Sequence, residues 1–178
     1  IYNIDISSVC IDQMKERNKE REKMKWEVMD VTDLNNEDET FDIAVDKSTI
    51  DALLWGDNAF LNVAKMTKEV QRVLKPGGIY FVISYGRPES RTFHFEREHL
   101  DFEVKQYILY PDNCKTEEEK NDKSHFVYIW KKGENASDAL KNWDRVKEQL
   151  EKEAKEEEQL AASDDSETED TPHYDDIR

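Results

Sequence analysis

Asp5, Asp30 and Asp46 each follow an apolar run in the first third of the chain, and these three side chains could do chemistry together. Ligands bind beyond the carboxyl ends of the strands of a parallel sheet, so acidic residues that end successive strands can meet along one rim. A carboxylate there can accept both hydroxyls of a ribose or the amino group of an adenine. The alternative is that each aspartate caps a helix or bonds its own backbone in a turn. The pattern as a whole favours a nucleoside site.

Short apolar strands must position these residues. Apolar runs typical of strands cover residues 1–4, 24–28, 41–45, 79–84, 103–110 and 124–131. A helix is expected after Ser7 or Ser8, and another between residues 58 and 74, where residues 75–78 end it sharply. This alternation predicts an α/β fold with a mostly parallel sheet, while the last two strands pair as an antiparallel hairpin at one edge. The polar residues 111–123 between them are expected to form a flexible loop.

Four segments carry a resemblance to a known family. They are IDISS at residues 4–8, MDV at 29–31, FDIAVDKSTIDA at 41–52 and RVLKPGG at 72–78. Together they resemble class I S-adenosylmethionine-dependent methyltransferases, in particular the methyltransferase-like family that includes the elongation-factor-1-alpha lysine methyltransferases and the mitochondrial citrate synthase lysine methyltransferase. The match covers about residues 1–132, and the segment at 46–52 is its most specific part. The resemblance implies a Rossmann-like fold of seven strands.

The resemblance also implies S-adenosylmethionine as cofactor and a set of binding residues at the strand ends. The implied cofactor-binding residues are Asp5, Ile6, Asp30, Val31, Asp46 and Lys47. The first two would hold the ribose, the next two the adenine, and Lys47 would lie at the approach to the cofactor. Ser48 stands where the family usually has glycine, so the backbone freedom of glycine is lost at that turn.

The glycine-rich loop that follows the family's first strand has no counterpart in this sequence. In the family's fold that strand lies between the strands expected here at residues 1–4 and 41–45. We therefore expect two facing strand edges with unpaired backbone groups, which are costly to bury. Preceding residues or another chain would fill the gap, and the chain alone is expected to bind the cofactor weakly.

Asp51, Trp55 and Tyr85 follow strand ends at which a substrate could enter. Methyl transfer to a lysine needs a neutral amine aligned with the methyl group, and no dedicated nucleophile. A carboxylate can attract the ammonium and aromatic faces can surround it, which is the role expected for these three residues. The alternative for each is a packing role, and for Trp55 that alternative is the stronger one. The dispersed histidines are expected to be surface or strand residues, and neither they nor the two cysteines form a metal-binding pattern.

The net charge of −16 argues against a protein that binds nucleic acid or an anionic membrane. Residues 134–178 carry 16 acidic and 6 basic side chains, so much of the charge lies there. We expect a methyltransferase domain at 1–133, a charged amphipathic helix at 134–162 and an acidic disordered tail at 163–178. The helix could dock on the domain, bind a partner helix or stay solvated, and docking is preferred.

The preferred function is protein-lysine N-methylation, with a translation elongation factor as one candidate substrate. One alternative is a small-molecule methyltransferase of the same fold. Another is a catalytically inactive relative that serves as a subunit of a larger assembly. No signal peptide or membrane span is present, so a cytoplasmic location is expected, with a mitochondrial one left open.

Overall fold

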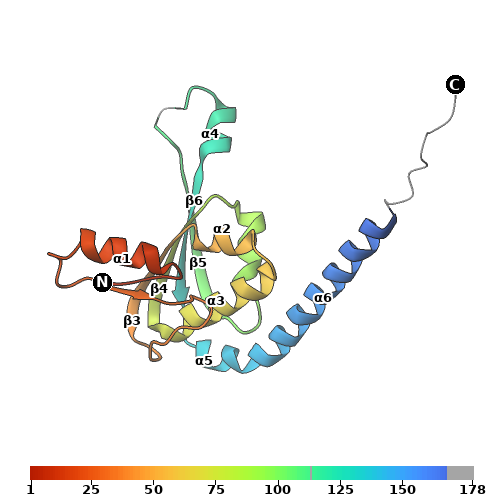
Figure 1. Cartoon of the computed structure of the whole chain (residues 1–178), viewed down its shortest axis with the longest axis horizontal. Helices are drawn as coiled ribbons and strands as arrows, with labels where there is room; N and C mark the ends of the chain where they lie inside the picture. The colour runs from red at the N-terminus through yellow and green to blue at the C-terminus, as the bar shows by residue number, and fades with distance from the viewer. Residues whose placement is uncertain (113, 168–178) are drawn as a thin grey trace, which may run out of the picture.

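The computed structural model describes the backbone of residues 1–112 and 114–167 (Figure 1). Its helices and strands are β1 (Tyr2–Asp5), α1 (Ser8–Arg17), β2 (Lys25–Val28), β3 (Phe41–Lys47), α2 (Thr49–Leu54), α3 (Ala59–Val73), β4 (Leu74–Ser84), β5 (Phe102–Leu109), α4 (Glu117–Lys123), β6 (His125–Lys132), α5 (Ala136–Ala139) and α6 (Trp143–Glu167). The predicted capping of the first helix is confirmed, because Ser7 Oγ accepts a hydrogen bond from the backbone N–H of Cys10.

The strands form two separate sheets. β1 pairs with β2 in parallel, and β3, β4, β6 and β5 form a second sheet in that order. β3 and β4 are parallel, whereas β6 runs antiparallel to both β4 and β5. The predicted parallel strands and the antiparallel edge hairpin are therefore confirmed. The sheet is interrupted between β1 and β3, where the sequence led us to expect two facing edges.

α3 packs on one face of the four-stranded sheet and forms the main core with it. Side chains at helical spacing on α3 meet aromatic and aliphatic residues of the sheet, and the buried members include Val63, Met66, Val70, Leu74, Tyr80, Val82, Tyr128 and Trp130. Burying an aliphatic side chain of this size contributes about 1.5–3 kcal/mol. α3 is thus fixed to the sheet along its length, and its other side chains are held in defined positions.

α6 docks on α3 and then leaves the body of the protein. Val146 and Leu150 of α6 are buried against Leu61 and Ala64 of α3, and Trp143 packs beside them. The later part of α6 extends away from the sheets (Figure 1). The first turns of α6 therefore dock on the domain, as preferred from the sequence.

Several boundaries differ from the expectations. Residues 111–123 include the short helix α4, whose first turn is capped by Thr116. α6 continues to Glu167, past the expected boundary at 162, and residues 168–178 of the expected tail lie outside the described residues. His94 and His99 are buried and not surface residues, because the turns after β4 fold under α3. None of the helices in the described ranges is long and apolar enough to cross a bilayer.

Candidate functional site

A cavity of about 1070 Å³ lies between β1 and β3. Its walls come from both sheets, from the loop between β2 and β3, from the start of α2 and from α3. All the residues that the resemblance assigned to the cofactor line it, namely Asp5, Ile6, Asp30, Val31, Asp46 and Lys47. Residues that are far apart in sequence thus meet around one space, because the parallel strands place their carboxyl ends at the same side.

Asp5 and Asp30 each use one carboxylate oxygen in a local turn. Asp5 Oδ1 accepts from the N–H of Ser7 at 2.8 Å. Asp30 Oδ1 accepts from both the N–H and the hydroxyl of Thr32, each at 2.8 Å. The turn interpretation and the ligand interpretation are compatible, because each local bond uses Oδ1, although the carboxylate of Asp5 also interacts with the thiol of Cys10. Both carboxylates line the cavity and can accept from hydroxyl or amino donors.

Asp46 is buried and bonded to the protein itself. Its oxygens accept from the backbone N–H groups of Thr49 at 2.6 Å and Ile50 at 3.1 Å, and from the hydroxyl of Tyr80 at 2.9 Å. These bonds satisfy the first N–H groups of α2, which otherwise lack a side-chain cap. Asp46 therefore shapes the end of β3, and its carboxylate is less available to a cofactor than the sequence suggested.

Ser48 adopts a left-handed backbone conformation between β3 and α2. Its φ is 66° and its ψ is 10°, a region that glycine enters without penalty and that costs other residues about 1–2 kcal/mol. Its N–H donates to the carbonyl of Ile83 at 2.9 Å. The turn thus keeps a conformation that favours glycine, and the neighbouring side chain, Lys47, is exposed at the cavity.

The carboxylate of Asp51 is paired within the protein. It forms a buried ion pair with Arg91 at 2.7 Å, and it also accepts from the hydroxyl of Ser84 and the N–H of Tyr85. Burial would raise the pKa of Asp51, but the hydrogen bonds from Ser84 and Arg91 outweigh it and hold the pKa below its ordinary value. This carboxylate fixes the turn that follows β4, and a role of Asp51 toward a substrate stays a prediction.

Trp55 and Tyr85 lie on the surface and do not line the cavity. Trp55 is 91% exposed, so it is not the packing residue that the alternative proposed. Tyr85 is 58% exposed, and its ring lies 4.3 Å from that of His125. The structure therefore does not bring Trp55 and Tyr85 together with the six expected cofactor-binding residues at the cavity.

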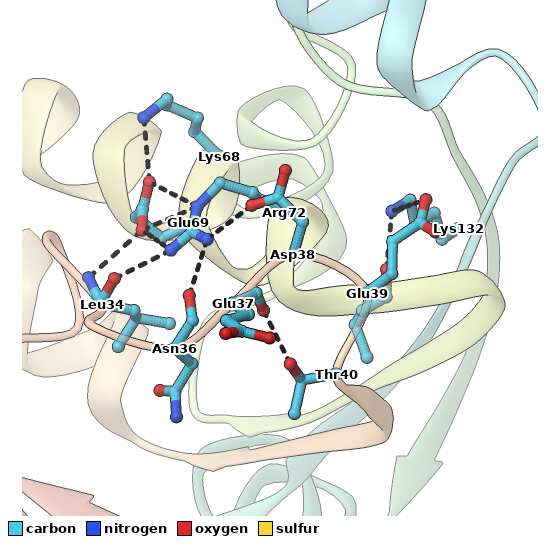
Figure 2. A network of polar contacts seen from close by, with 11 residues as sticks. Leu34, Asn36, Glu37, Asp38, Glu39, Thr40, Lys68, Glu69, Arg72 and Lys132 are labelled. Carbon is cyan, nitrogen blue, oxygen red and sulfur yellow. Dashed lines mark hydrogen bonds and ion pairs between the residues drawn. The ribbon is translucent and has the colours of Figure 1, made fainter.

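Sequence reasoning did not foresee the roles of Arg72, Glu69 and Arg91. Arg72 belongs to the motif at 72–78, which carries the family resemblance but gives no local indication of a contact with the loop. On α3, Arg72 and Glu69 bind the loop between β2 and β3 (Figure 2). The helical position of Arg72 three residues after Glu69 is a sequence signal for their ion pair, whereas nothing local in the sequence indicates that the loop is their partner.

The donor set fits a nucleoside better than a metal ion. The carboxylates of Asp5 and Asp30 flank walls made of apolar side chains such as Met29 and Leu53. No group of histidine, cysteine and acidic residues within the described ranges could hold a metal ion. The arrangement can bind ribose hydroxyls and an adenine and shield them from water.

Comparison with known proteins agrees with this geometry. Residues 1–82 match the family model described as a methyltransferase domain. The eEF1A lysine and N-terminal methyltransferase of Mus musculus is 43% identical over 104 residues, which are 55% of this chain and 15% of that protein. The Bos taurus protein of the same name is 36% identical over 138 residues, 74% of this chain and 20% of that protein. EEF1A lysine methyltransferase 4 of Bos taurus is 30% identical over 59% of this chain and 44% of its own length.

Solved structures show the same fold. The N-methyltransferase NodS from Bradyrhizobium japonicum, in complex with S-adenosyl-L-homocysteine, has a TM-score of 0.57 and 16% identity over 75% of this chain and 66% of its own. A SAM-dependent methyltransferase from Methanosarcina mazei has a TM-score of 0.54 and 19% identity over 74% of this chain and 81% of its own. The predicted resemblance to class I S-adenosylmethionine-dependent methyltransferases is confirmed, and the fold is the Rossmann-like fold of that class. The chain spans less than half the length of the curated relatives named above.

Proposed function

We propose that this chain is the cofactor-binding part of an S-adenosylmethionine-dependent protein-lysine N-methyltransferase, with eEF1A as the candidate substrate and the cytoplasm as its location. The observation that carries the proposal is the convergence of Asp5, Asp30 and Lys47 on one cavity between β1 and β3. The names of the most similar relatives supply the substrate class, because they refer to lysine methylation of eEF1A.

The residues of the chain would act by binding and orientation. Bound S-adenosylmethionine supplies an activated methyl group, so no side chain has to act as a nucleophile. The carboxylate of Asp5 would accept from ribose hydroxyls, and that of Asp30 from the adenine amino group. The N–H of Val31 would donate to the adenine ring. Apolar walls exclude water from the same space, which strengthens these polar contacts.

We also infer that an extended segment lies along the facing edges of β1 and β3. The cavity exceeds the range of about 300–1,000 Å³ that is typical of ligand pockets. A second cavity of about 410 Å³ adjoins its other end and shares Tyr2, Asn36 and Phe41 with it, so the opening follows the edges lengthwise. The edge of β3 that faces β1 has no strand paired to it among the described residues. Ile43 and Val45, which share one face of β3, are 60% and 71% exposed, so that face is also uncovered.

The segment can come from another part of the protein or from a partner chain. Its source bears on whether the protein is an active methyltransferase or an inactive subunit of an assembly. An inactive subunit of an assembly would use the same edges to hold a partner without binding the cofactor. A small-molecule methyltransferase would bind the cofactor but would not methylate a protein. The outer edge of β3, which ends the four-stranded sheet and is unpaired in the described part of the chain, is the observation that favours testing the assembly subunit.

A titration of the labelled chain with S-adenosylhomocysteine, followed by amide NMR up to millimolar concentrations, tests the proposal. Weak binding is expected for the chain alone, and NMR detects it. Shifts are expected at the amides of Ile6, Val31 and Lys47, which line the cavity, and not in α6. Asp5→Asn and Asp30→Asn should each weaken binding by about tenfold, because a hydrogen bond to a charged group contributes about 1.5–3 kcal/mol.

Asp12→Asn is the matched control, since Asp12 is an exposed aspartate of α1 that does not line the cavity. Shifts that spread over the whole chain, or equal affinity of Asp5→Asn and Asp12→Asn, would contradict the nucleoside site. For the substrate, the natural protein should transfer methyl groups to a lysine of eEF1A. Cofactor binding without transfer to any protein favours the small-molecule alternative, and neither binding nor transfer favours the assembly subunit.

A further inference from the structure

The loop between β2 and β3 forms one wall of the cavity but has little structure of its own. Residues 31–40 contain no helix or strand. Leu34 and Asn36 from this loop line the cavity, and both are only partly exposed. A loop without a backbone ladder needs external contacts to stay in one conformation. The contacts that hold these two residues therefore decide the shape of this wall.

Arg72 of α3 supplies most of these contacts with one guanidinium (Figure 2). Its Nη2 donates to the carbonyl of Leu34 at 2.8 Å, and its Nη1 donates to the carbonyl of Asn36 at 2.7 Å. Nη1 also binds the carboxylate of Asp38 at 2.7 Å. The carbonyl of Arg72 accepts from the N–H of Glu39 at 3.0 Å. A single residue of the core helix thus holds the loop at four positions.

Glu69 completes the arrangement one turn earlier on α3. Its Oε2 accepts from the N–H of Leu34 at 3.2 Å and pairs with Nη2 of Arg72 at 2.6 Å. Leu34 is therefore held at both its N–H and its carbonyl. The side chain of Glu69 is 6% exposed, and burial would raise its pKa, but the hydrogen bonds from Arg72 and Lys68 keep the pKa below its ordinary value. Glu69 stays charged and keeps the guanidinium in place.

We propose that Arg72, oriented by Glu69, is a positioning residue for the nucleoside site, because it holds the cavity wall formed by Leu34 and Asn36. Neither Arg72 nor Glu69 lines the cavity, so any effect on a ligand must pass through the loop. The inference rests on the proposed cofactor site and adds the residues that set its affinity. α3 in turn is fixed by the core, so the wall is connected to a rigid element.

The planar fork of the guanidinium is essential to this role. It reaches two carbonyls and two carboxylates at once, whereas a lysine ammonium is a compact charge that cannot span these acceptors in one geometry. Arg72→Lys is therefore expected to lose the ordering of the loop almost as fully as Arg72→Gln, although it keeps the positive charge. This distinguishes a geometric role from a purely electrostatic one.

Hydrogen–deuterium exchange of the loop tests the positioning directly and needs no cofactor. In Arg72→Gln and Arg72→Lys, exchange of residues 32–39 should rise at least tenfold more than exchange in β4 and β6, which reports the change in global stability. Asp38→Asn provides a second variant that does not endanger folding, because the Asp38 side chain is 73% exposed. It should raise exchange at residues 36–39 by a smaller factor. Arg145→Gln is the matched control, since Arg145 pairs with Glu98 on the surface and does not contact the loop.

Binding of S-adenosylhomocysteine, measured on the same variants by NMR titration, tests the consequence. Affinity should fall about tenfold in Arg72→Gln relative to Arg145→Gln, because small displacements of positioned groups are costly. In the natural protein this should appear as a raised KM for S-adenosylmethionine with little change in kcat, whereas a merely destabilised enzyme would lose kcat as its folded fraction falls.

The outcomes separate this inference from the proposed function. Unchanged loop exchange in Arg72→Gln overturns the positioning role, whatever the cofactor does. Raised exchange with unchanged affinity overturns the link between the loop and the site. If neither the unmodified chain nor the natural protein binds the cofactor, the proposed cofactor site is wrong, and so is the link to affinity. The exchange result still decides whether Arg72 orders the loop.

Discussion

Lowering the pH from 7.5 to 5.5 should cost the folded protein about 3 kcal/mol through His94 and His99. Burial lowers the pKa of His94 to about 3, and the charges of Arg97 and Arg91 add to this effect. Burial also lowers the pKa of His99 to about 4, although its contact with the carbonyl of Ala64 opposes the shift. Both rings are neutral in the folded state over this range, whereas the ordinary pKa of 6.5 applies after unfolding.

The sign follows from the difference in bound protons. At pH 5.5 each histidine of the unfolded chain is about 90% protonated, while the folded chain binds neither proton, so acidification favours unfolding. One pH unit below the unfolded pKa, this difference is worth about 1.4 kcal/mol for each ring. The carboxylates with lowered pKa, Asp51 and Glu69, lose their contribution only at lower pH, near and below the unfolded carboxyl range. The chosen range therefore isolates the histidines.

Urea unfolding at the two pH values measures this loss. His94→Phe should halve the pH dependence with little cost at pH 7.5. The reason is that His94 packs in a cluster with the rings of Phe60 and Phe93, and neither of its nitrogens has a hydrogen-bond partner among the described residues. His125→Gln is the control, since this half-exposed residue begins β6. Equal pH dependence in His94→Phe and the unmodified protein would refute the assignment to buried histidines.

Two further predictions concern the strand ends. Ser48→Gly should raise the free energy of unfolding by about 0.5–1 kcal/mol in thermal or urea unfolding, because it relieves the left-handed conformation, whereas Ser48→Ala should give no gain. Arg91→Met should lower the free energy of unfolding by about 3–5 kcal/mol, because it leaves the buried carboxylate of Asp51 without its counter-charge. The double variant Asp51→Asn, Arg91→Met should recover most of that loss, and failure to recover it would show that the ion pair is not the cause.

Local patterns were enough to predict the strands and the main helix. The spacing of apolar residues on α3 follows the helical period, and apolar runs form residues 79–83 of β4 and 126–130 of β6, so short stretches of sequence predict their burial. Residues 75–78, near the start of β4, were expected only to end the preceding helix. The strand-end residues Asp5 and Asp30 could also be predicted to meet. Their convergence requires only that β1 and β2 run parallel, which the intervening helix α1 imposes.

Long-range pairing could not be predicted in the same way. Asp51 and Arg91 are 40 residues apart, and Arg72 and Leu34 are 38 apart, so no local period relates either pair. The sequence therefore led us to expect that the carboxylate of Asp51 is free, whereas in the structure it pairs with Arg91 from a turn after β4. The histidines give another example, since a polar residue among aromatic ones is compatible with a surface, a strand or a core until the packing is known.

By itself, the sequence determined the main strands, helix α3 and the α/β class, and it predicted the rim at which we propose that a nucleoside binds, because hydrophobic period and strand direction are local properties. Only the tertiary structure decided which charges are free. It pairs the charge of Asp51 with Arg91, buries His94 and His99, and uses Arg72 to hold the cavity wall. Each of these outcomes depends on which distant side chain comes within a few ångströms.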